Sequence, residues 1–180
     1  MTIENGRPAD ESDRLPKEIA VYDLLEQLGI PFVRADHAAA FTMDACESVS
    51  VALQTPICKN LFLCNRQKTN FYLLLMPGDK PFRTKEITSQ LGCARLSFAS
   101  EEALEQLLQL TPGSATIFGL MHDTENRVQL LVDCDLLKAF TFGCHPCINT
   151  STLRMQTIDV FDKLTNALHH PYTLVTLKGE

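Results

Sequence analysis

The sequence ICKNLFLCN, residues 57–65, and the sequence NFYLLLMP, residues 70–77, flank the polar segment RQKT. Both runs are apolar, contain aromatic residues and have the length of a strand, whereas the segment between them is short and polar, as a turn is. We therefore expect a β-hairpin in the core of the fold. The remaining predicted elements are arranged around this hairpin.

The segments on both sides of the hairpin alternate between single helices and strands. Apolar residues at helical spacing predict the helices, with Gly29 and Gly92 at two of their ends and Ser100 at a start. The predicted helices cover residues 15–29, 43–53, 84–92, 101–110 and 158–170, and the predicted strands cover residues 30–37, 94–98, 111–120 (after an initial turn), 127–133, 138–143, 149–155 and 172–177. Without regular βαβ alternation, the expected class is α+β: a mixed, mainly antiparallel sheet, curled and barrel-like, with helices packed outside.

The composition indicates one globular domain. The chain has 180 residues, 45% of them hydrophobic, which is enough for one sizeable core. We expect this domain to span residues 15–180 and to follow a flexible, polar segment of residues 1–14 that has no signal-peptide or membrane-anchor character. Seven cysteines at scattered spacings disfavour a disulfide scaffold, so we expect a cytoplasmic protein.

The charge is unevenly distributed along the chain. The formal net charge is −6, yet residues 59–95 carry seven lysines and arginines against two acids, Asp79 and Glu86. One interpretation is an ordinary solvated face. The other is a surface that contacts phosphates and steers a polyanion toward one side of an acidic protein.

The segment GCHPCINT, residues 143–150, places two cysteines around a histidine and a proline. A redox pair needs a helix N-terminus to lower the thiol pKa, but Cys147 is followed by a strand-like stretch. A zinc site needs four ligands, and there is no second Cys-x-x-Cys motif to supply them. We therefore expect neither a metal nor a cofactor, and we interpret Cys144 and Cys147 as packing residues.

Lys59 lies inside the apolar run of the first predicted hairpin strand. Burying an ammonium group costs free energy unless it reaches a partner or a cleft. A lysine that extends to solvent from an edge strand is an equally good interpretation of Lys59 alone. The glycine-bounded segment PGSATIFG and the His-Pro-x-x-Asn segment favour a cleft.

With these segments in view, the sequence resembles the bacterial prolyl-tRNA editing family, the YbaK/ProX superfamily, and within it the free-standing Ala-tRNA(Pro) deacylases. The similarity runs from YDLLEQLGIPF to the C-terminal strand. It is carried by KNLFL (59–63), ARLSFAS (94–100), TPGSATIF (111–118) and GCHPCINT (143–150), in family order. The resemblance implies the fold of that superfamily, also called the prolyl-tRNA-synthetase-associated domain.

The resemblance also implies the site residues. The family's cleft lysine corresponds to Lys59, the expected catalytic residue. The family's Gly-x-x-x-Pro loop corresponds to residues 113–117, with Ile117 in place of the proline, and its Gly-x-His-Pro segment to residues 143–146. The expected substrate-binding residues are Phe41, Thr42, Met43, Asn60, Gly113, Ser114, Ala115, Thr116, Ile117, Phe118, Gly119, Gly143, His145, Pro146 and Asn149.

The implied partner is the acceptor end of a mischarged tRNA, with a transient encounter with prolyl-tRNA synthetase and no role for DNA or a membrane. The expected phosphate contacts are Arg66, Lys68, Lys80, Arg83 and Lys85. A proline pocket excludes the smaller alanine weakly, since a methylene group is worth about 1–3 kcal/mol, so a second hydrolytic site is needed. Two alternatives are the same fold acting on another mischarged tRNA, such as Cys-tRNA(Pro), and a non-catalytic module that binds an amino acid or aminoacyl-tRNA.

Overall fold

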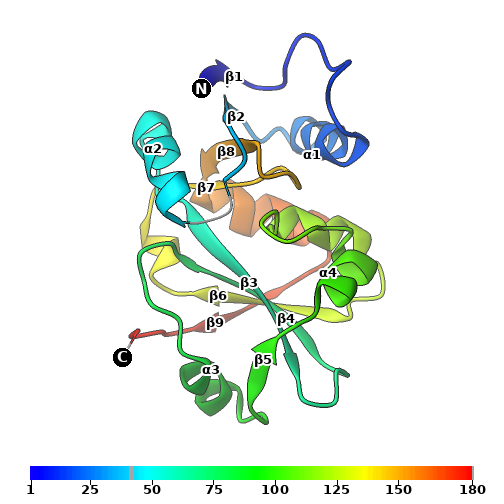
Figure 1. Ribbon diagram of the computed structural model, residues 1–180, viewed down its shortest axis with the longest axis vertical. Coiled ribbons are helices and arrows are strands. Elements are labelled where there is room, and N and C mark those ends of the chain that lie inside the picture. Colours follow the sequence, from blue (N-terminus) through cyan, green and yellow to red (C-terminus); the bar gives the residue numbers. More distant parts are fainter. Residues whose placement is uncertain (41–42, 180) are drawn as a thin grey trace.

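The computed structural model describes residues 1–40 and 43–179, with side chains described outside residues 43–45. Its strands form two sheets, a smaller one in the upper half of Figure 1 and a larger one in the lower half. The larger sheet has the order β5 (Leu96–Phe98), β3 (Cys58–Asn65), β4 (Phe71–Pro77), β6 (Val128–Asp133) and β9 (Tyr172–Val175). Its centre is the predicted hairpin, β3–β4, in which Leu61 pairs with Leu74.

The larger sheet is apolar on both faces. Alternate residues of β4 point to opposite sides, so that Leu73 and Leu75 enter the main core while Leu74 and Met76 enter a second cluster, which includes Ile87. The parallel pairs β4–β6 and β6–β9 complete this sheet. Burial on both sides explains why NFYLLLMP is a continuous apolar run without alternation.

The smaller sheet is antiparallel throughout. Its order is β1 (Thr2–Asn5), β2 (Phe32–Asp36), β8 (Ser151–Gln156) and β7 (Thr141–Cys144). An isolated parallel bridge between Ile57 and Gly143 joins it to the start of β3. The two sheets therefore meet where the GCHPCINT segment passes the Lys59 end of the hairpin.

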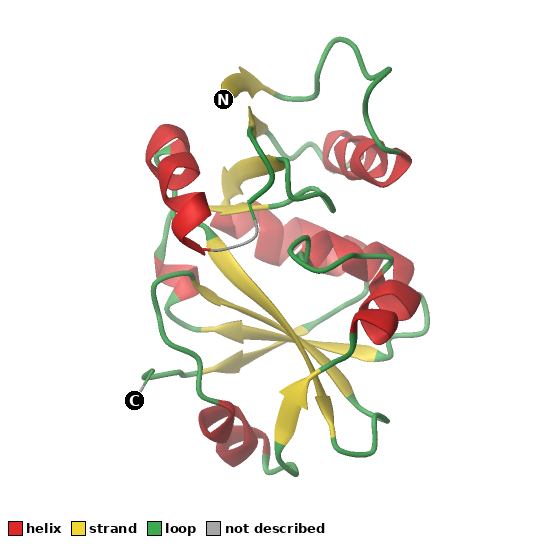
Figure 2. Ribbon diagram, in the orientation of Figure 1, coloured by secondary structure: helices red, strands yellow, loops and turns green. Residues whose placement is uncertain are grey.

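The helices lie around the strands (Figure 2). The longer ones are α1 (Pro16–Gln27), α2 (Met43–Leu53), α3 (Thr84–Leu91) and α4 (Glu101–Leu108), and the shorter ones are η1 (Ile117–His122), η2 (Leu136–Lys138), α5 (Thr157–Asp159), η3 (Val160–Leu164) and α6 (Thr165–Ala167). The predicted caps are confirmed, because Gly92 ends α3 in the left-handed conformation and Ser100 Oγ accepts the Ala103 N–H at 3.1 Å. The segment α5–η3–α6 forms the predicted closing helix, with a π-helical middle.

The α+β class with mainly antiparallel strand pairs is confirmed, and three details differ from the expectation. The sheets are open, so the described residues form no closed barrel. Residues 117–122 form the 3-10 helix η1 where a strand was expected, because Ile117 and Phe118 both point into the main core instead of alternating. Part of the segment expected to be flexible, Thr2–Asn5, pairs with β2 as β1.

Candidate active site

Lys59 is the second residue of β3, beside the junction of the two sheets. Its side chain is half-buried, and its Nζ donates a hydrogen bond to the main-chain oxygen of Lys80 at 2.8 Å. A peptide carbonyl is neutral, so this contact holds the ammonium in place without cancelling its charge. From the sequence, the Lys59 ammonium was expected to reach a partner or a cleft. Its partner is the main-chain carbonyl of Lys80, which lies beside a cleft.

Two cavities adjoin Lys59 and share Cys46, Ile57 and Lys59 in their walls. The inner cavity, of about 270 Å³, is lined by Ala40, Cys46, Ile57, Cys58, Lys59, Asn60, Leu61, Gly113, Ala115 and His145. The outer cavity, of about 590 Å³, is lined by Cys46, Glu47, Ser50, Pro56, Ile57, Lys59, Gly78 and Asp79. Lys59 is the only lysine or arginine among the described residues in these walls.

Asn60 lines the inner cavity and carries an unpaired side-chain acceptor. Its Nδ2 lies 3.4 Å from the Cys58 carbonyl oxygen and 3.3 Å from Cys58 Sγ. Its Oδ1 is buried and has no hydrogen-bond partner among the described residues. Leaving a buried acceptor unsatisfied costs free energy, so Asn60 Oδ1 is suited to accept an N–H or O–H from a bound molecule.

The loop before η1 supplies Gly113 and Ala115 to the opposite wall of the inner cavity. Ser114 holds this loop together, because its Oγ donates to the Thr111 carbonyl oxygen at 2.8 Å and accepts the Thr111 N–H at 3.1 Å. Gly113 has a φ of +82°, in the left-handed region where glycine is favoured. The turn thus exposes main chain, rather than bulky side chains, to the cavity.

His145 adds an imidazole with a defined tautomer. Its Nδ1 lies 2.7 Å from the main-chain oxygen of Ser151, and a carbonyl can only accept, so Nδ1 carries the proton and Nε2 is the acceptor nitrogen. Burial lowers the pKa of His145, which favours this neutral form. Behind it, Thr152 Oγ1 lies 3.4 Å from His145 Nδ1 and 2.8 Å from His37 Nε2.

The structure brings five of the predicted site residues into the inner cavity: Lys59, Asn60, Gly113, Ala115 and His145. The other described residues of that prediction support these walls or lie in the core. They are Ser114, Thr116, Ile117, Phe118, Gly119, Gly143, Pro146 and Asn149. Phe41 and Thr42 lie outside the described residues, as does the side chain of Met43.

Two of these residues act through their backbone. Gly143 donates its N–H to the Pro56 carbonyl oxygen at 2.8 Å, and a Cβ at this position would lie 2.6 Å from Ile57 Cδ1. Asn149 accepts the Ala40 N–H on its main-chain oxygen at 2.9 Å. Both therefore shape the cavity from behind its wall, through Ile57 and Ala40.

Sequence reasoning missed His37 and the apolar wall formed by Cys46, Ile57, Cys58 and Leu61. Three of the wall residues flank the Lys59-Asn60 pair in sequence, so strand geometry around Lys59 could have indicated them. Nothing in the sequence indicated His37, because it is distant from His145 along the chain although their ring centres lie only 6.1 Å apart.

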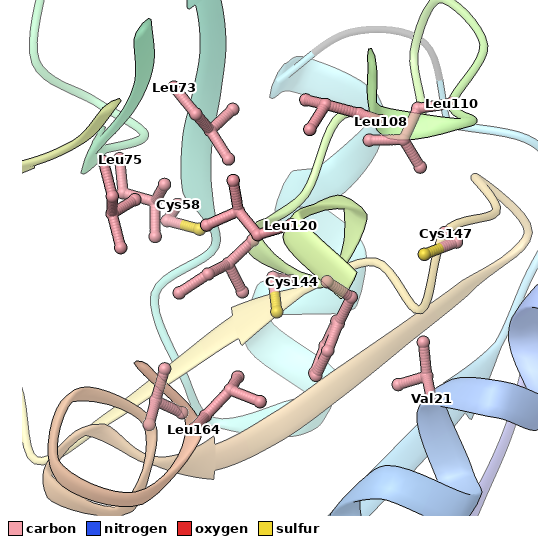
Figure 3. Close-up of a cluster of buried hydrophobic side chains, with 14 of the residues drawn as sticks. Val21, Cys58, Leu73, Leu75, Leu108, Leu110, Leu120, Cys144, Cys147 and Leu164 are labelled. Atoms are coloured by element: carbon pink, nitrogen blue, oxygen red, sulfur yellow. The ribbon is translucent and has the colours of Figure 1, made fainter. Parts of the chain in front are cut away.

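The thiols of Cys144 and Cys147 are core groups. Both are buried in the main hydrophobic cluster, with leucine side chains nearby in Figure 3. Burial raises the pKa of Cys144 well above its ordinary value and that of Cys147 to about 12. This is the opposite of the lowered pKa that a reactive thiol needs.

The predicted phosphate contacts occupy different places. Arg66 and Lys68 lie at the β3–β4 turn, and Arg83 and Lys85 at the start of α3, all exposed. Lys80 differs from the expectation, because its Nζ is held by Asp133 Oδ2 at 2.5 Å and Asp135 Oδ2 at 2.6 Å, and its side chain is only 14% exposed. An ammonium that is already paired with two carboxylates is poorly suited to bind a phosphate.

The sequence-family model of the aminoacyl-tRNA editing domain matches residues 37–163 of this chain. These residues include every residue of the inner cavity. The chain belongs to the aminoacyl-tRNA editing domain family. The reaction of this family is hydrolysis of the ester bond between an amino acid and tRNA, so the protein is a hydrolase of that class. No helix in the described part of the chain has the length and apolar character needed to cross a membrane.

Individual relatives extend over nearly the same length. The chain is 28% identical over 158 residues to the prolyl-tRNA editing protein ProX of Acetoanaerobium sticklandii, covering 88% of this chain and 96% of the relative. It is 28% identical over 173 residues to prolyl-tRNA synthetase associated domain-containing protein 1 of Danio rerio, covering 95% and 92%. A crystal structure of a candidate trans-editing enzyme for prolyl tRNA synthetase has the same fold, with a TM-score of 0.67 at 18% identity over 91% of this chain and 98% of that one.

Proposed function

We propose that the protein is a trans-editing deacylase that hydrolyses Ala-tRNA(Pro) in the cytoplasm, as a single editing domain over residues 15–180. The observation that supports this proposal is the small inner cavity, which is lined together by Lys59, by Asn60 with its unpaired Oδ1 and by His145. The names of the prolyl-tRNA editing relatives support the choice of tRNA. The prolyl-tRNA synthetase would be a transient partner that releases the mischarged product.

The proposed reaction is attack of water on the ester carbonyl carbon. The ester C–O bond breaks, and the products are a free amino acid and a tRNA with a restored terminal hydroxyl. An aminoacyl ester is already activated, so positioning and charge stabilisation suffice and no covalent nucleophile is required. The high pKa of the cavity thiol Cys58, raised to about 12 by burial, is consistent with this.

Each cavity residue has a role that follows from its contacts. The Lys59 ammonium, which is held by a neutral carbonyl, would stabilise the oxygen that becomes negative in the transition state. Asn60 Oδ1 would accept from the α-amino group or a ribose hydroxyl, and the main chain at Gly113 and Ala115 would position the aminoacyl group. His145 Nε2 would accept a hydrogen bond from the attacking water or from the terminal ribose hydroxyl that orients it.

Selectivity would come from size. Ile57, Leu61 and Ala115 are apolar lining residues of the inner cavity, and the space between these side chains, rather than the whole volume of about 270 Å³, would set the size limit. An alanyl group would enter, whereas the ring of a prolyl group would be excluded, so that the correctly charged tRNA survives. A cysteinyl group is larger than an alanyl group by one sulfur atom. Comparing the hydrolysis of Cys-tRNA(Pro) with that of Ala-tRNA(Pro) therefore tests the size limit of the inner cavity.

The test is a deacylation assay with tRNA(Pro) charged with alanine, cysteine or proline. We expect hydrolysis of Ala-tRNA(Pro), little of Pro-tRNA(Pro), and a loss of about 10²–10³ in rate for Lys59→Ala, since one preorganised electrostatic contact disappears. The control is Lys163→Ala, which removes an exposed lysine paired with Asp159 on the closing helix. Efficient cleavage of Pro-tRNA(Pro) would refute size exclusion, and full activity of Lys59→Ala would refute the mechanism. Binding without turnover on every substrate would indicate a non-catalytic module.

A further inference from the structure

Lys80 makes contacts in two opposite directions. Its side-chain Nζ binds Asp133 Oδ2 at 2.5 Å, Asp135 Oδ2 at 2.6 Å and the main-chain oxygen of Leu177 at 2.8 Å. Its own main-chain oxygen accepts the hydrogen bond from Lys59 Nζ at 2.8 Å. One residue thus connects the cavity lysine to the C-terminal ends of β6 and β9.

The sheet topology explains how these groups meet. Lys80 lies in the loop that follows β4, Asp133 is the last residue of β6, and Leu177 lies two residues beyond β9. Because β4, β6 and β9 are parallel neighbours, their C-terminal ends lie along the same edge of the sheet. The loop after β4 therefore passes directly by the ends of the other two strands.

The three acceptors fix the Lys80 side chain. An ammonium has three N–H donors, and here three acceptors use all of them. The side chain of Asp133 is fully buried, so loss of its ion pair with Lys80 would leave a buried carboxylate without a partner of opposite charge. Asp133, Cys134 and Asp135 have ligand atoms close enough to hold a cation, and the Lys80 ammonium supplies that charge.

The C-terminal segment fixes the same loop from outside. Gly179 lies so close that a Cβ there would be 3.1 Å from Pro81 Cδ and 3.4 Å from Lys80 Cγ. Glu86 of α3 accepts the N–H groups of Lys178 at 2.7 Å and Gly179 at 3.2 Å. The carbonyl that receives Lys59 thus belongs to a loop held on two sides.

We propose that Lys80 is a positioning residue for Lys59. Its ion pairs lock the loop, and the locked loop presents a neutral carbonyl that aims the Lys59 ammonium at the cavity while leaving its charge for the substrate. This proposal rests on the proposed catalytic role of Lys59. The ion pairs of Lys80 would therefore affect the rate of hydrolysis indirectly, through the position of the Lys59 ammonium.

The test is a double-mutant cycle with Lys59→Ala, Lys80→Met and both together, measured as kcat and KM for Ala-tRNA(Pro). We expect Lys80→Met to lower kcat about 10- to 100-fold with KM nearly unchanged, since a small misplacement of a catalytic group has that effect. In the Lys59→Ala background the same change should have less than about a two-fold effect, because the group that Lys80 positions is gone. Lys80→Arg should restore part of the rate.

A milder pair of variants covers the case in which Lys80→Met fails to fold. Asp135→Asn removes the negative charge of one partly exposed partner of Lys80 and should lower kcat several-fold, but only when Lys59 is present. The matched control is Lys138→Met, which removes the exposed partner on the other oxygen of Asp135 and should leave the rate unchanged. Equal losses in both Lys59 backgrounds, or no loss in either, would overturn the proposal. Full activity of Lys59→Ala alone would instead refute the catalytic role of Lys59, and no hydrolysis of Ala-tRNA(Pro) by the wild type would refute the proposed function.

Discussion

Arg34 in the smaller sheet and Lys59 in the larger one are both cations on apolar strands, but their surroundings differ. The Arg34 side chain is 2% exposed and binds Glu4, Asp36 and the Gly6 main-chain oxygen, so two carboxylates neutralise it. Lys59 is half-buried, binds a neutral carbonyl and faces two cavities. The partner of a buried cation therefore distinguishes a charge that stabilises the fold from one that is available to a substrate.

The largest effect expected from this comparison is the stability loss of Arg34→Met. The change removes a buried guanidinium that is paired with two carboxylates and should lower the free energy of unfolding by about 3 kcal/mol, while kcat of the folded protein stays near the wild-type value. Urea unfolding and the deacylation assay measure the two quantities. Arg7→Met is the control, because Arg7 pairs with three acids in partly exposed contacts and should cost less than about 1 kcal/mol. A rate loss in Arg34→Met comparable to that of Lys59→Ala would abolish the distinction.

Alanine substitutions at two glycines should distinguish an effect on the shape of the cavity from an effect on the stability of the fold. In Gly143→Ala the new methyl group would meet Ile57 Cδ1 at 2.6 Å, and this flexible end can move only by changing the cavity wall. In Gly119→Ala it would meet Leu110 Cδ1 at 2.6 Å and Leu108 Cβ at 3.1 Å, which are core groups.

We expect Gly119→Ala to cost about 1–3 kcal/mol with unchanged selectivity between Ala-tRNA(Pro) and Cys-tRNA(Pro), since overpacking a core is destabilising. Gly143→Ala should cost less stability but change the rate or the selectivity. Thermal unfolding and competition assays measure both. Identical profiles for the two variants would show that Gly143 does not act on the cavity.

The stability of the protein at low pH should depend on Asp36, which lies in the smaller sheet. Burial opposes ionisation of Asp36, but the hydrogen bonds from Arg14 and Arg34 outweigh it and lower its pKa from 3.8 to about 2. A lowered pKa in the folded state stabilises the fold above pH 4, and this contribution disappears as the pH falls from about 4 to about 2. Urea midpoints across this range should fall more steeply for the wild type than for Asp36→Asn, and parallel curves would contradict the assignment.

The smallest effects concern the exposed basic residues. Arg66, Lys68, Arg83 and Lys85 are proposed tRNA contacts, and each neutral substitution should weaken binding modestly and reduce the salt slope by about one unit per lost phosphate contact. Lys138→Ala provides the comparison, since Lys138 lies outside this set and is also exposed. Slopes that do not change in any variant would identify these residues as ordinary solvated surface.

The sequence predicted the elements whose signal is local. The β3–β4 hairpin and the caps of α3 and α4 follow from short apolar runs, glycine and serine, and the structure confirms them. The strand predicted within residues 111–120 was wrong, because apolar composition alone does not separate a strand from a short helix that packs into a core, as η1 does. β1 was missed because a polar edge strand, which pairs with one neighbour only, carries no hydrophobic pattern.

The candidate site was predictable where the residues themselves are unusual. A lysine in an apolar strand drew attention to Lys59, yet Arg34 is as unusual in its own strand and escaped notice. The sequence also suggested Lys80 as a phosphate contact, because charge density along the chain does not reveal that Asp133 and Asp135 are its partners. Which charges pair is set by the topology of β4, β6 and β9, and this depends on contacts distant in sequence.

The contacts of Lys80 also have a consequence for the order of folding. Lys59 and its acceptor carbonyl are 21 residues apart, whereas the Lys80 side chain reaches partners 53 and 97 residues further along the chain. Closing long loops is entropically costly, so the local β3–β4 hairpin can form first. The full set of Lys80 side-chain contacts forms only when β9 has docked. During synthesis, a nascent chain that already contains Lys59 would therefore reach its full rate of hydrolysis only after β9 has left the ribosome.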